Sequence, residues 1–374
     1  MSKIKILTEN NIQFEAEGND HFIQTERKAF VDMISDKSII KSVTALQEAG
    51  IPPQQAPNIR YENVVIFDDA GIPSIMVKFT KTTNKELFGG SDKTHPAFII
   101  GGKEYDEIYI SKYPNTLING KPYSLPFNKP ATNIANDDAT AACFSKGEGW
   151  HMVTAPEWGL LALDSLKNGT LPHGNTNSGQ YNNTDEKGVT YDGSCGKTLT
   201  GSGPATWTHS HTPEGVHDLC GNVWEMVRGL RIINGVIQTP DNNDAALDID
   251  LTKTGKAWKD ITDDDGNTIR VSVADDGILI TTDEDIEQDY SGSRWEGIEI
   301  NCQSDQLKEL ALFNGEPNAY CYLDSTEGEY FPIRGGGWGG GASAGVFAAS
   351  LGDPRSLSVS PFGFRSAFYR KTGN

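Results

Sequence analysis

Hydrophobic positions in the first ninety residues follow two different patterns. Over residues 25–49 the apolar side chains recur at helical spacing, and the Gly-Ile-Pro-Pro sequence that follows predicts the end of a helix. Residues 61–69 and 74–81 then alternate as two strands around a Gly-Ile-Pro turn, which predicts a hairpin. Residues 82–93 are polar and read as a linker. We therefore predict a small α+β N-terminal domain over residues 1–92.

Beyond about residue 97 the chain consists of short apolar runs between polar, glycine-rich stretches. A helix is predicted over residues 155–167, because Thr154 and Glu157 form a capping-box pattern before it and an Asn-Gly pair follows it. Residues 232–237 are apolar around an Asn-Gly pair, which favours a type I′ turn between two strands. Short strands with few helices predict an α+β fold for this part as well.

Length and charge narrow the classes of partner. The 374 residues are enough for two or three domains. The net charge is −19, so the chain lacks the excess of Lys and Arg that binding to nucleic acid or anionic lipid requires. No apolar run approaches the roughly 18 residues of a membrane span, so we expect no membrane insertion. The first residues lack the apolar core of a signal peptide, and we expect none.

Acidic residues concentrate in one part of the chain. Residues 241–300 hold 17 Asp or Glu against 5 Lys or Arg, which is −12 of the total charge. Within this block, residues 269–274 and 277–282 alternate like strands. We interpret a span at about 239–320 as an acidic β-rich insertion, folded but dispensable to the domain that carries it.

Familiar catalytic patterns are missing from the sequence. It contains no GxSxG, HExxH, phosphate-loop or dinucleotide-binding motif. The five cysteines are scattered without a CxxC pair, which favours buried apolar side chains over a zinc or redox site. The residues alone therefore indicate an acidic α+β protein with an unusual Gly/Ser-rich C-terminal segment and no recognisable catalytic centre.

Three motifs, taken in order, point to a known family. They are GEGWHMVT at 147–154 leading into Glu157-Trp158, VHDLCGNVWEM at 216–226, and Arg334-Gly335-Gly336 with Trp338, closed by GFRSA at 363–367. Their order and spacing resemble the formylglycine-generating-enzyme (sulfatase-modifying factor) family over residues 94–370, apart from the insertion. The resemblance implies a C-type-lectin-like fold for residues 93–374, on a rigid scaffold of Trp158, Trp224, Trp338 and Arg365.

The same resemblance implies a structural Ca²⁺ site but no catalyst. In the family, the segment that corresponds to residues 218–225 can hold Ca²⁺ through oxygens at the positions that here are Asp218, Gly221, Val223 and Glu225. Glu225 is equally suited to capping a backbone turn. The family's cysteine pair falls at Gly340 and Gly345, which can neither bind copper nor form a disulfide. The His-rich segment of the iron-binding relatives is also missing from the sequence. We expect no enzyme activity and no required cofactor.

A second resemblance concerns residues 334–367. They are similar to the variable region of diversity-generating-retroelement target proteins, in which a reverse transcriptase copies a template and randomises its adenines. An AAC codon randomised in this way never yields Lys, Glu, Gln, Met or Trp, and residues 335–363 contain none of these except Trp338, a scaffold position. The positions mapped as variable are Gly337, Gly339, Gly340, Ser343, Ser350, Gly352, Asp353, Leu357, Val359, Ser360 and Pro361.

Together the resemblances imply a hypervariable ligand-binding protein, with residues 1–92 serving attachment or homo-oligomerisation. Its variable residues should face solvent together, because a core does not tolerate a randomised side chain. The interleaved residues expected to face inward are Trp338, Phe347, Leu351 and Phe364. The expected ligand is a protein or glycan of a host surface, and the expected location is a phage virion, at its tail or tip, or the cell interior before assembly. A formylglycine-generating-type oxidase with displaced catalytic residues and an invariant structural virion protein are the alternatives.

Overall fold

The computed structural model describes residues 2–7, 13–18, 61–69 and 71–371. The chain divides into two compact units, Met1–Ile59 and Arg60–Asn374. In the first unit, β1 (Ser2–Leu7) and β2 (Gln13–Gly18) form an antiparallel hairpin. The helix predicted over residues 25–49 lies outside the described residues.

The boundary between the units falls at residues 59 and 60, not at residue 92 as the sequence predicted. β3 (Tyr61–Phe67) and β4 (Pro73–Thr80) do form the predicted hairpin, but β4 also pairs with β7 (Glu107–Ser111). The expected linker contains α3 (Asn84–Phe88), whose Leu87 is buried in the main core. Long-range strand pairing thus joins this part of the predicted N-terminal domain to the second unit, and the boundary is corrected accordingly.

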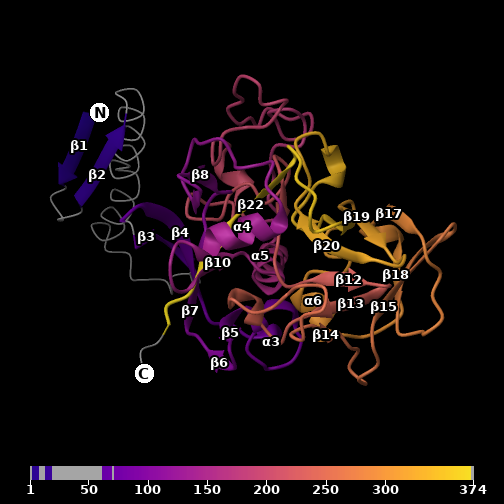
Figure 1. The fold of residues 1–374 in the computed structure, drawn as a ribbon. Coiled ribbons are helices and arrows are strands. Elements are labelled where there is room, and N and C mark those ends of the chain that lie inside the picture. The colour runs from indigo at the N-terminus through magenta and orange to yellow at the C-terminus, as the bar shows by residue number, and fades with distance from the viewer. Residues whose placement is uncertain (1, 8–12, 19–60, 70, 372–374) are drawn as a thin grey trace, which may run out of the picture. The chain divides into compact units, whose positions relative to one another are not determined.

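The second unit is a mixed α+β structure built mostly from strands, which confirms the predicted class (Figure 1). A five-stranded sheet has the order β10-β23-β7-β4-β3, with β10 (Trp150–Met152) and β23 (Ser366–Phe368) at one end. A twelve-stranded sheet has the order β17-β19-β21-β20-β12-β13-β15-β16-β18, and β11, β22 and β14 pair beside this path. Two-stranded hairpins are formed by β5 (Ile99–Ile100) with β6 (Lys103–Glu104) and by β8 (Thr116–Ile118) with β9 (Lys121–Tyr123).

The strands of the large sheet come from the second half of the chain. They are β11 (Trp224–Met226), β12 (Arg231–Ile233), β13 (Val236–Thr239), β14 (Lys259–Asp260), β15 (Arg270–Ala274), β16 (Gly277–Thr281), β17 (Tyr290–Arg294), β18 (Ile298–Ile300), β19 (Tyr320–Asp324), β20 (Glu329–Arg334), β21 (Ala349–Asp353) and β22 (Phe362–Phe364). β12 and β13 are joined by Asn234 and Gly235 at φ 49° and 79°, as the predicted type I′ turn requires.

The predicted helix forms as α5 (Ala155–Asn168), at the centre of the unit. Thr154 Oγ1 accepts from the backbone N–H of Glu157 at 3.3 Å, and Glu157 Oε2 accepts from the backbone N–H of Thr154 at 3.0 Å, which completes the capping box. All residues from 155 to 165 are buried, so the helix is enclosed on every side rather than along one stripe. Further helices are α4 (Asn136–Phe144) and α6 (Asp305–Glu309).

The acidic insertion is folded and β-rich, and it is part of the domain core. Its strands extend the large sheet on one flank of the unit, drawn in orange in Figure 1. Val271, Ile280 and Trp295 are buried in the same apolar cluster as Trp158 of α5. Trp295 also donates from Nε1 to the carbonyl of Phe347 at 2.8 Å. This packing argues against the expectation that the insertion is dispensable, because its side chains complete the core.

Replacing Trp295 by Ala tests whether the insertion stabilises the domain. We expect the free energy of unfolding to fall by about 3–5 kcal/mol, because a fully buried indole and its hydrogen bond are lost. Phe67→Ala, at a side chain 48% exposed on β3, is the control and should change stability little. Urea denaturation followed by far-ultraviolet circular dichroism measures both, and a Trp295→Ala variant as stable as the control would contradict the assignment.

Candidate functional site

Two glycines turn the chain out of β20 and into the segment that carries the predicted variable residues. Gly335 and Gly336 have φ of 91° and 86°, a region that other residues enter only with strain. A Cβ on Gly335 would lie 2.9 Å from the Leu219 carbonyl oxygen, and one on Gly336 would lie 2.5 Å from the Cβ of Ala344. The two glycines of the Arg-Gly-Gly motif therefore make a turn that residues with a Cβ could adopt only with strain.

Ten of the eleven predicted variable residues are at least partly exposed to solvent. Gly339 is exposed, and the half-buried ones are Gly337, Gly340, Ser343, Gly352, Asp353, Leu357, Val359, Ser360 and Pro361. Ser350 is the exception, with 5% of its surface exposed. It lies in β21 between β19 and β20, and its hydroxyl donates to Asp353 Oδ2 at 3.2 Å. The expectation for Ser350 is corrected, because a position inside a central strand is covered by its neighbours.

Three of the four residues expected to face inward do so. Phe347, Leu351 and Phe364 are fully buried, whereas Trp338 is only half-buried. The Lys197 ammonium lies 4.6 Å from the centre of a Trp338 ring and donates to Ser360 Oγ at 2.8 Å. The expectation for Trp338 is therefore corrected: its indole is a surface group that, through Lys197, links the beginning of the segment to its end.

Leu357 and Val359 rest on a small apolar cluster beneath the segment. Both are half-buried and pack against a group that includes Met226 and Phe364. Leu357 and Asp353 also line one shallow cleft with Phe362. The two apolar variable residues thus keep part of their surface in solvent, although composition alone would place them in the core.

The contacts of the variable residues define two neighbourhoods. In the first, a Cβ on Gly337 would lie 3.4 Å from Trp224 Cδ1, and Ser360 lies beside Lys197 and Trp338. In the second, Gly352 lies against the ring of Tyr290, which belongs to the insertion. We call these the tryptophan neighbourhood and the tyrosine neighbourhood. The shallow cleft between Asp353 and Leu357 lies on the stretch of chain that connects them.

One short strand pairs with both ends of the variable segment. β11 pairs antiparallel with β20, where Glu225 is opposite Arg334, and parallel with β22, where Glu225 is opposite Gly363. The chain therefore leaves and returns beside the same three residues, Trp224–Met226. Whatever side chains the segment carries, its two ends are fixed in the sheet.

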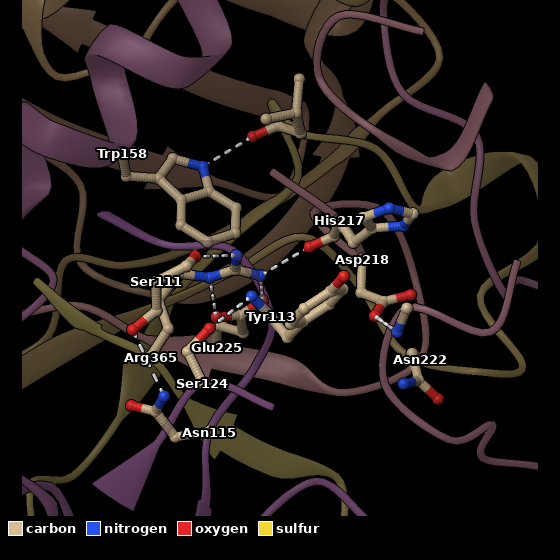
Figure 2. A network of polar contacts seen from close by, with 12 residues as sticks. Ser111, Tyr113, Asn115, Ser124, Trp158, His217, Asp218, Asn222, Glu225 and Arg365 are labelled. Atoms are coloured by element: carbon tan, nitrogen blue, oxygen red, sulfur yellow. Dashed lines mark hydrogen bonds and ion pairs between the residues drawn. The ribbon is translucent and has the colours of Figure 1, made fainter. Parts of the chain in front are cut away.

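We call the pairing of β11 with both β20 and β22 the clamp. A buried ion pair stabilises it (Figure 2). Arg365 Nε donates to Glu225 Oε2 at 2.6 Å, and Arg365 Nη2 donates to Glu225 Oε1. The guanidinium also donates to the carbonyls of Ser111 at 3.1 Å and His217 at 3.0 Å. Both side chains are fully buried, and burial raises the pKa of Glu225 while the charge of Arg365 opposes that rise. Arg365 therefore binds one carboxylate and two backbone carbonyls from within the core.

The residues expected to hold Ca²⁺ do not fit that ion. Both oxygens of Glu225 accept from Arg365, so this carboxylate is committed to a guanidinium and the expectation for it is corrected. Asp218 is buried, with Oδ2 accepting from the Gly201 N–H at 2.7 Å and Oδ1 without a hydrogen bond. Burial raises the pKa of Asp218 to about 6. Among the residues that the structure describes, no three His, Cys, Asp or Glu side chains gather as a metal site.

Gly221 and Val223 lie in a loop that protein hydrogen bonds hold. The Gly221 N–H donates to the carbonyl of Gly335 at 2.9 Å, and the side-chain oxygen of Asn222 accepts from the Thr198 N–H at 2.8 Å. Val223 is buried. The loop is therefore ordered by hydrogen bonds within the chain itself.

The formylglycine-generating-enzyme family, which the sequence resembles, has one of its two cysteines at the position that is Gly345 here. The buried carboxyl group of Glu316 occupies the space beside it. A Cβ on Gly345 would overlap the carboxyl group of Glu316, and Glu316 Oε2 accepts from the Phe347 N–H at 3.2 Å. Burial raises the pKa of Glu316 to about 7. At the other position, a Cβ on Gly340 would lie 3.1 Å from the Cβ of Ala344. A thiol at position 345 would therefore need Glu316 to move.

Sequence reasoning missed the constant residues that border the variable ones. Lys197, Glu316 and Tyr290 belong to no motif and lie far along the chain from the positions they contact. Nothing in the local sequence marks these residues, because lysines and tyrosines in polar segments are common. Tertiary packing brings them to the segment, in the case of Tyr290 through the pairing of β17 with β19 and of β19 with β21, and such contacts are not readable from local spacing.

Breaking the ion pair between Glu225 and Arg365 should destabilise the domain. Replacing Glu225 by Gln leaves the guanidinium of Arg365 buried without a counter-charge, and we expect the free energy of unfolding to fall by about 3–5 kcal/mol. The control is Glu148→Gln, which breaks an exposed pair with Lys371 and should cost at most about 1 kcal/mol. If urea denaturation gave the same loss of unfolding free energy for both variants, the buried guanidinium of Arg365 would not need the charge of Glu225.

Glu316 should make stability depend on pH in a defined direction. Its pKa rises from 4.5 to about 7 on folding, so the folded chain holds this proton more tightly than the unfolded chain. The contribution of Glu316 to stability is therefore full below pH 4.5 and is lost as the pH rises to about 7. Between pH 4.5 and about 7, the melting temperature of Glu316→Gln should rise relative to that of the wild type. An offset between the two that stays constant with pH would contradict this prediction.

Comparison with known proteins adds one distant likeness. No family model and no curated protein matches the chain. A solved structure, that of PvdO from Pseudomonas aeruginosa, is similar at 14% sequence identity over 82% of this chain and 98% of that chain, with a TM-score of 0.35. At that TM-score the likeness transfers neither a fold nor an activity to this chain.

Proposed function

We propose that the chain is a ligand-binding protein whose residues 337–361 have been diversified by a retroelement on a C-type-lectin-like domain of the formylglycine-generating-enzyme type. The observation that carries the proposal is the exposure of the variable positions in two stretches, 337–343 and 352–361, on either side of a buried run at 344–351. Ten of the eleven positions reachable by adenine randomisation keep contact with solvent, whereas Phe347 and Leu351 between them and Phe364 just after them are fully buried. A diversified surface on a constant core requires this arrangement.

The energetics of burial support the proposal. A charged side chain placed in the core without a partner costs several kcal/mol, a large share of the ~5–15 kcal/mol by which a domain is stable. Randomisation that reached Phe347 or Leu351 would therefore unfold most variants. At Gly339 or Ser360 the side chain can point into solvent, and the clamp through β11 holds both ends of the segment. The segment acts as an antibody loop does, with changing side chains on fixed ends.

An enzyme of the formylglycine-generating type is the less favoured function. Gly340 and Gly345 offer no thiol, and the Glu316 carboxyl group takes the space beside position 345. The binding function needs no cofactor, and we propose none. Oxygen uptake by the copper-loaded chain with a cysteine-containing peptide would overturn this part of the proposal.

The ligand and the location belong to the same proposal. We place the protein on a phage virion, at the tail or tip, where the diversified segment meets a protein or glycan of the host surface. The first unit, Met1–Ile59, serves attachment or homo-oligomerisation. The chain's charge of −19 favours such a partner over nucleic acid. Within the described residues no helix is both long and apolar enough to cross a membrane.

Tolerance to substitution tests the proposed function. Gly339→Asp and Ser343→Tyr, both reachable from an AAC codon, should change the free energy of unfolding by no more than about 0.5 kcal/mol. Phe347→Asp buries an unpaired charge and should prevent folding, and Phe347→Leu, which keeps the position apolar, should fold.

Binding completes the same experiment. A display library with the ten solvent-contacting codons randomised as NNC should yield folded variants that bind different proteins, and a library randomised at ten exposed residues outside the segment should not. If the two libraries performed alike, or if Gly339→Asp destabilised the chain as much as Phe347→Asp, the segment would not be a diversified binding surface.

A further inference from the structure

Three tyrosines lie together at the edge of the large sheet, next to variable positions. Tyr290 is on β17, the edge strand of the described path, and Tyr320 and Tyr322 are on β19 beside it. β19 in turn pairs with β21, where Tyr322 is opposite Ser350. The insertion and the strand after it thus place constant aromatic side chains next to positions 350–353.

The rings lie over glycines rather than standing away from the sheet. A Cβ on Gly292 would overlap the rings of Tyr320 and Tyr322, and a Cβ on Gly352 would overlap the ring of Tyr290. The Tyr320 hydroxyl donates to the Gly292 carbonyl at 3.0 Å, which holds that ring down. A ring that covers a glycine turns one face to the backbone and leaves the other for a ligand.

The three rings adjoin one another, and the Tyr320 ring is tilted by 41° from that of Tyr322. The Tyr290 and Tyr322 rings are inclined by 17°, with centres 6.4 Å apart, and the centres of the Tyr320 and Tyr322 rings are 4.7 Å apart. Tyr290 is 50% exposed, although aromatic side chains of this size are usually covered. We call these three residues the tyrosine platform.

The charge beside the platform is negative. Burial raises the pKa of Tyr290, and the carboxylates of Asp353 and Asp324 raise it further. Asp353 is half-buried and accepts from the Ser350 hydroxyl, but it forms no ion pair with the described residues. The cation on β17, Arg294, donates instead to the side-chain oxygen of Asn318 at 2.7 Å. Among the residues that the structure describes, the platform therefore offers aromatic faces beside a carboxylate that forms no ion pair.

We propose that the tyrosine platform, with Asp353, binds the guanidinium or ammonium groups of a basic segment of a protein partner. This inference rests on the proposed function and names the partner class for one end of the same surface. A cation over a tyrosine face is attracted by the ring, and a guanidinium stacks on it while it pairs with a carboxylate. Neutral glycans also stack on tyrosines, but the unbalanced Asp353 favours a cation.

Position 352 sets the shape of the platform. With Gly352, Tyr290 lies down over β21; any other side chain there would push the ring away. Gly352 is one of the variable positions, so diversification would switch the constant tyrosine between two placements. The insertion thus supplies a fixed part of the binding surface, and the variable segment decides how it is presented.

Peptide binding to the full chain tests the inference. The probe is a fluorescent peptide of alternating Arg and Gly, and its control is the same peptide with citrulline, which has nearly the same shape without the charge. Fluorescence anisotropy should detect binding of the Arg peptide only. Tyr290→Ala and Tyr322→Ala should each weaken it by about 2- to 30-fold, the range given by a cation–π contact of about 0.5–2 kcal/mol.

Matched variants separate the platform from the general acidity of the chain. Asp353→Asn should weaken binding of the Arg peptide, whereas Asp265→Asn, an equal change of charge in an exposed turn, should leave it unchanged. Phe67→Ala is the control for loss of an exposed aromatic. Gly352→Val should weaken binding by displacing Tyr290. Circular dichroism confirms that each variant is folded.

Three results would overturn the inference. They are equal binding of the citrulline peptide, equal effects of Asp353→Asn and Asp265→Asn, and tyrosine-dependent binding of neutral oligosaccharides without binding of the Arg peptide. The last would assign the platform to a glycan. None of them affects the tolerance of Gly339 and Ser343 to substitution, so failure of this inference and failure of the proposed function are distinguishable.

Discussion

Arg365 and Glu225 meet where the strands at both ends of the variable segment join the same short strand. β11 pairs with β20 before the segment and with β22 after it, and Glu225 of β11 faces the guanidinium that directly follows β22. Four hydrogen bonds satisfy the buried guanidinium. A buried charge pair stabilises little relative to apolar residues, but removing either partner is costly. The pair therefore enforces one arrangement of strands more than it adds stability.

This constraint explains how a surface can vary without loss of the fold. Between the two clamped ends, the chain inserts Phe347 and Leu351 into the core and leaves Gly339, Ser343 and Ser360 in contact with solvent. Side-chain changes at the solvent positions leave the core contacts intact. The constant groups that border the segment, Lys197 and Tyr290 among them, come from other parts of the chain. On the proposed function, the surface is a composite of variable and constant residues, and the acidic insertion contributes Tyr290 to it.

Local patterns were sufficient to predict the elements whose signals are local. The capping box of Thr154 and Glu157 predicted α5, and the Asn-Gly pair at 234–235 predicted its turn, because hydrogen bonds and φ values within a few residues determine both. The boundary at residue 92 was wrong because β4 pairs with β7, a contact that no local pattern encodes. Ser350 and Trp338 were misplaced for the same reason: their exposure is set by β19, β20 and Lys197. For Glu225 the family resemblance left a Ca²⁺ ligand and a turn cap open, and its actual partner, Arg365, lies 140 residues away, beyond the reach of any local pattern.

The most direct test of the central claim is the DNA sequence around the gene. Retroelement diversification predicts a near-copy of codons 334–367 beside a reverse-transcriptase gene. The copy should differ from the coding segment at adenines, and the differences should fall in the codons of the eleven variable positions. The codons for Phe347, Leu351 and Phe364 should match. A flanking region without such a copy, or a copy whose differences fall equally on these three codons, would contradict the account.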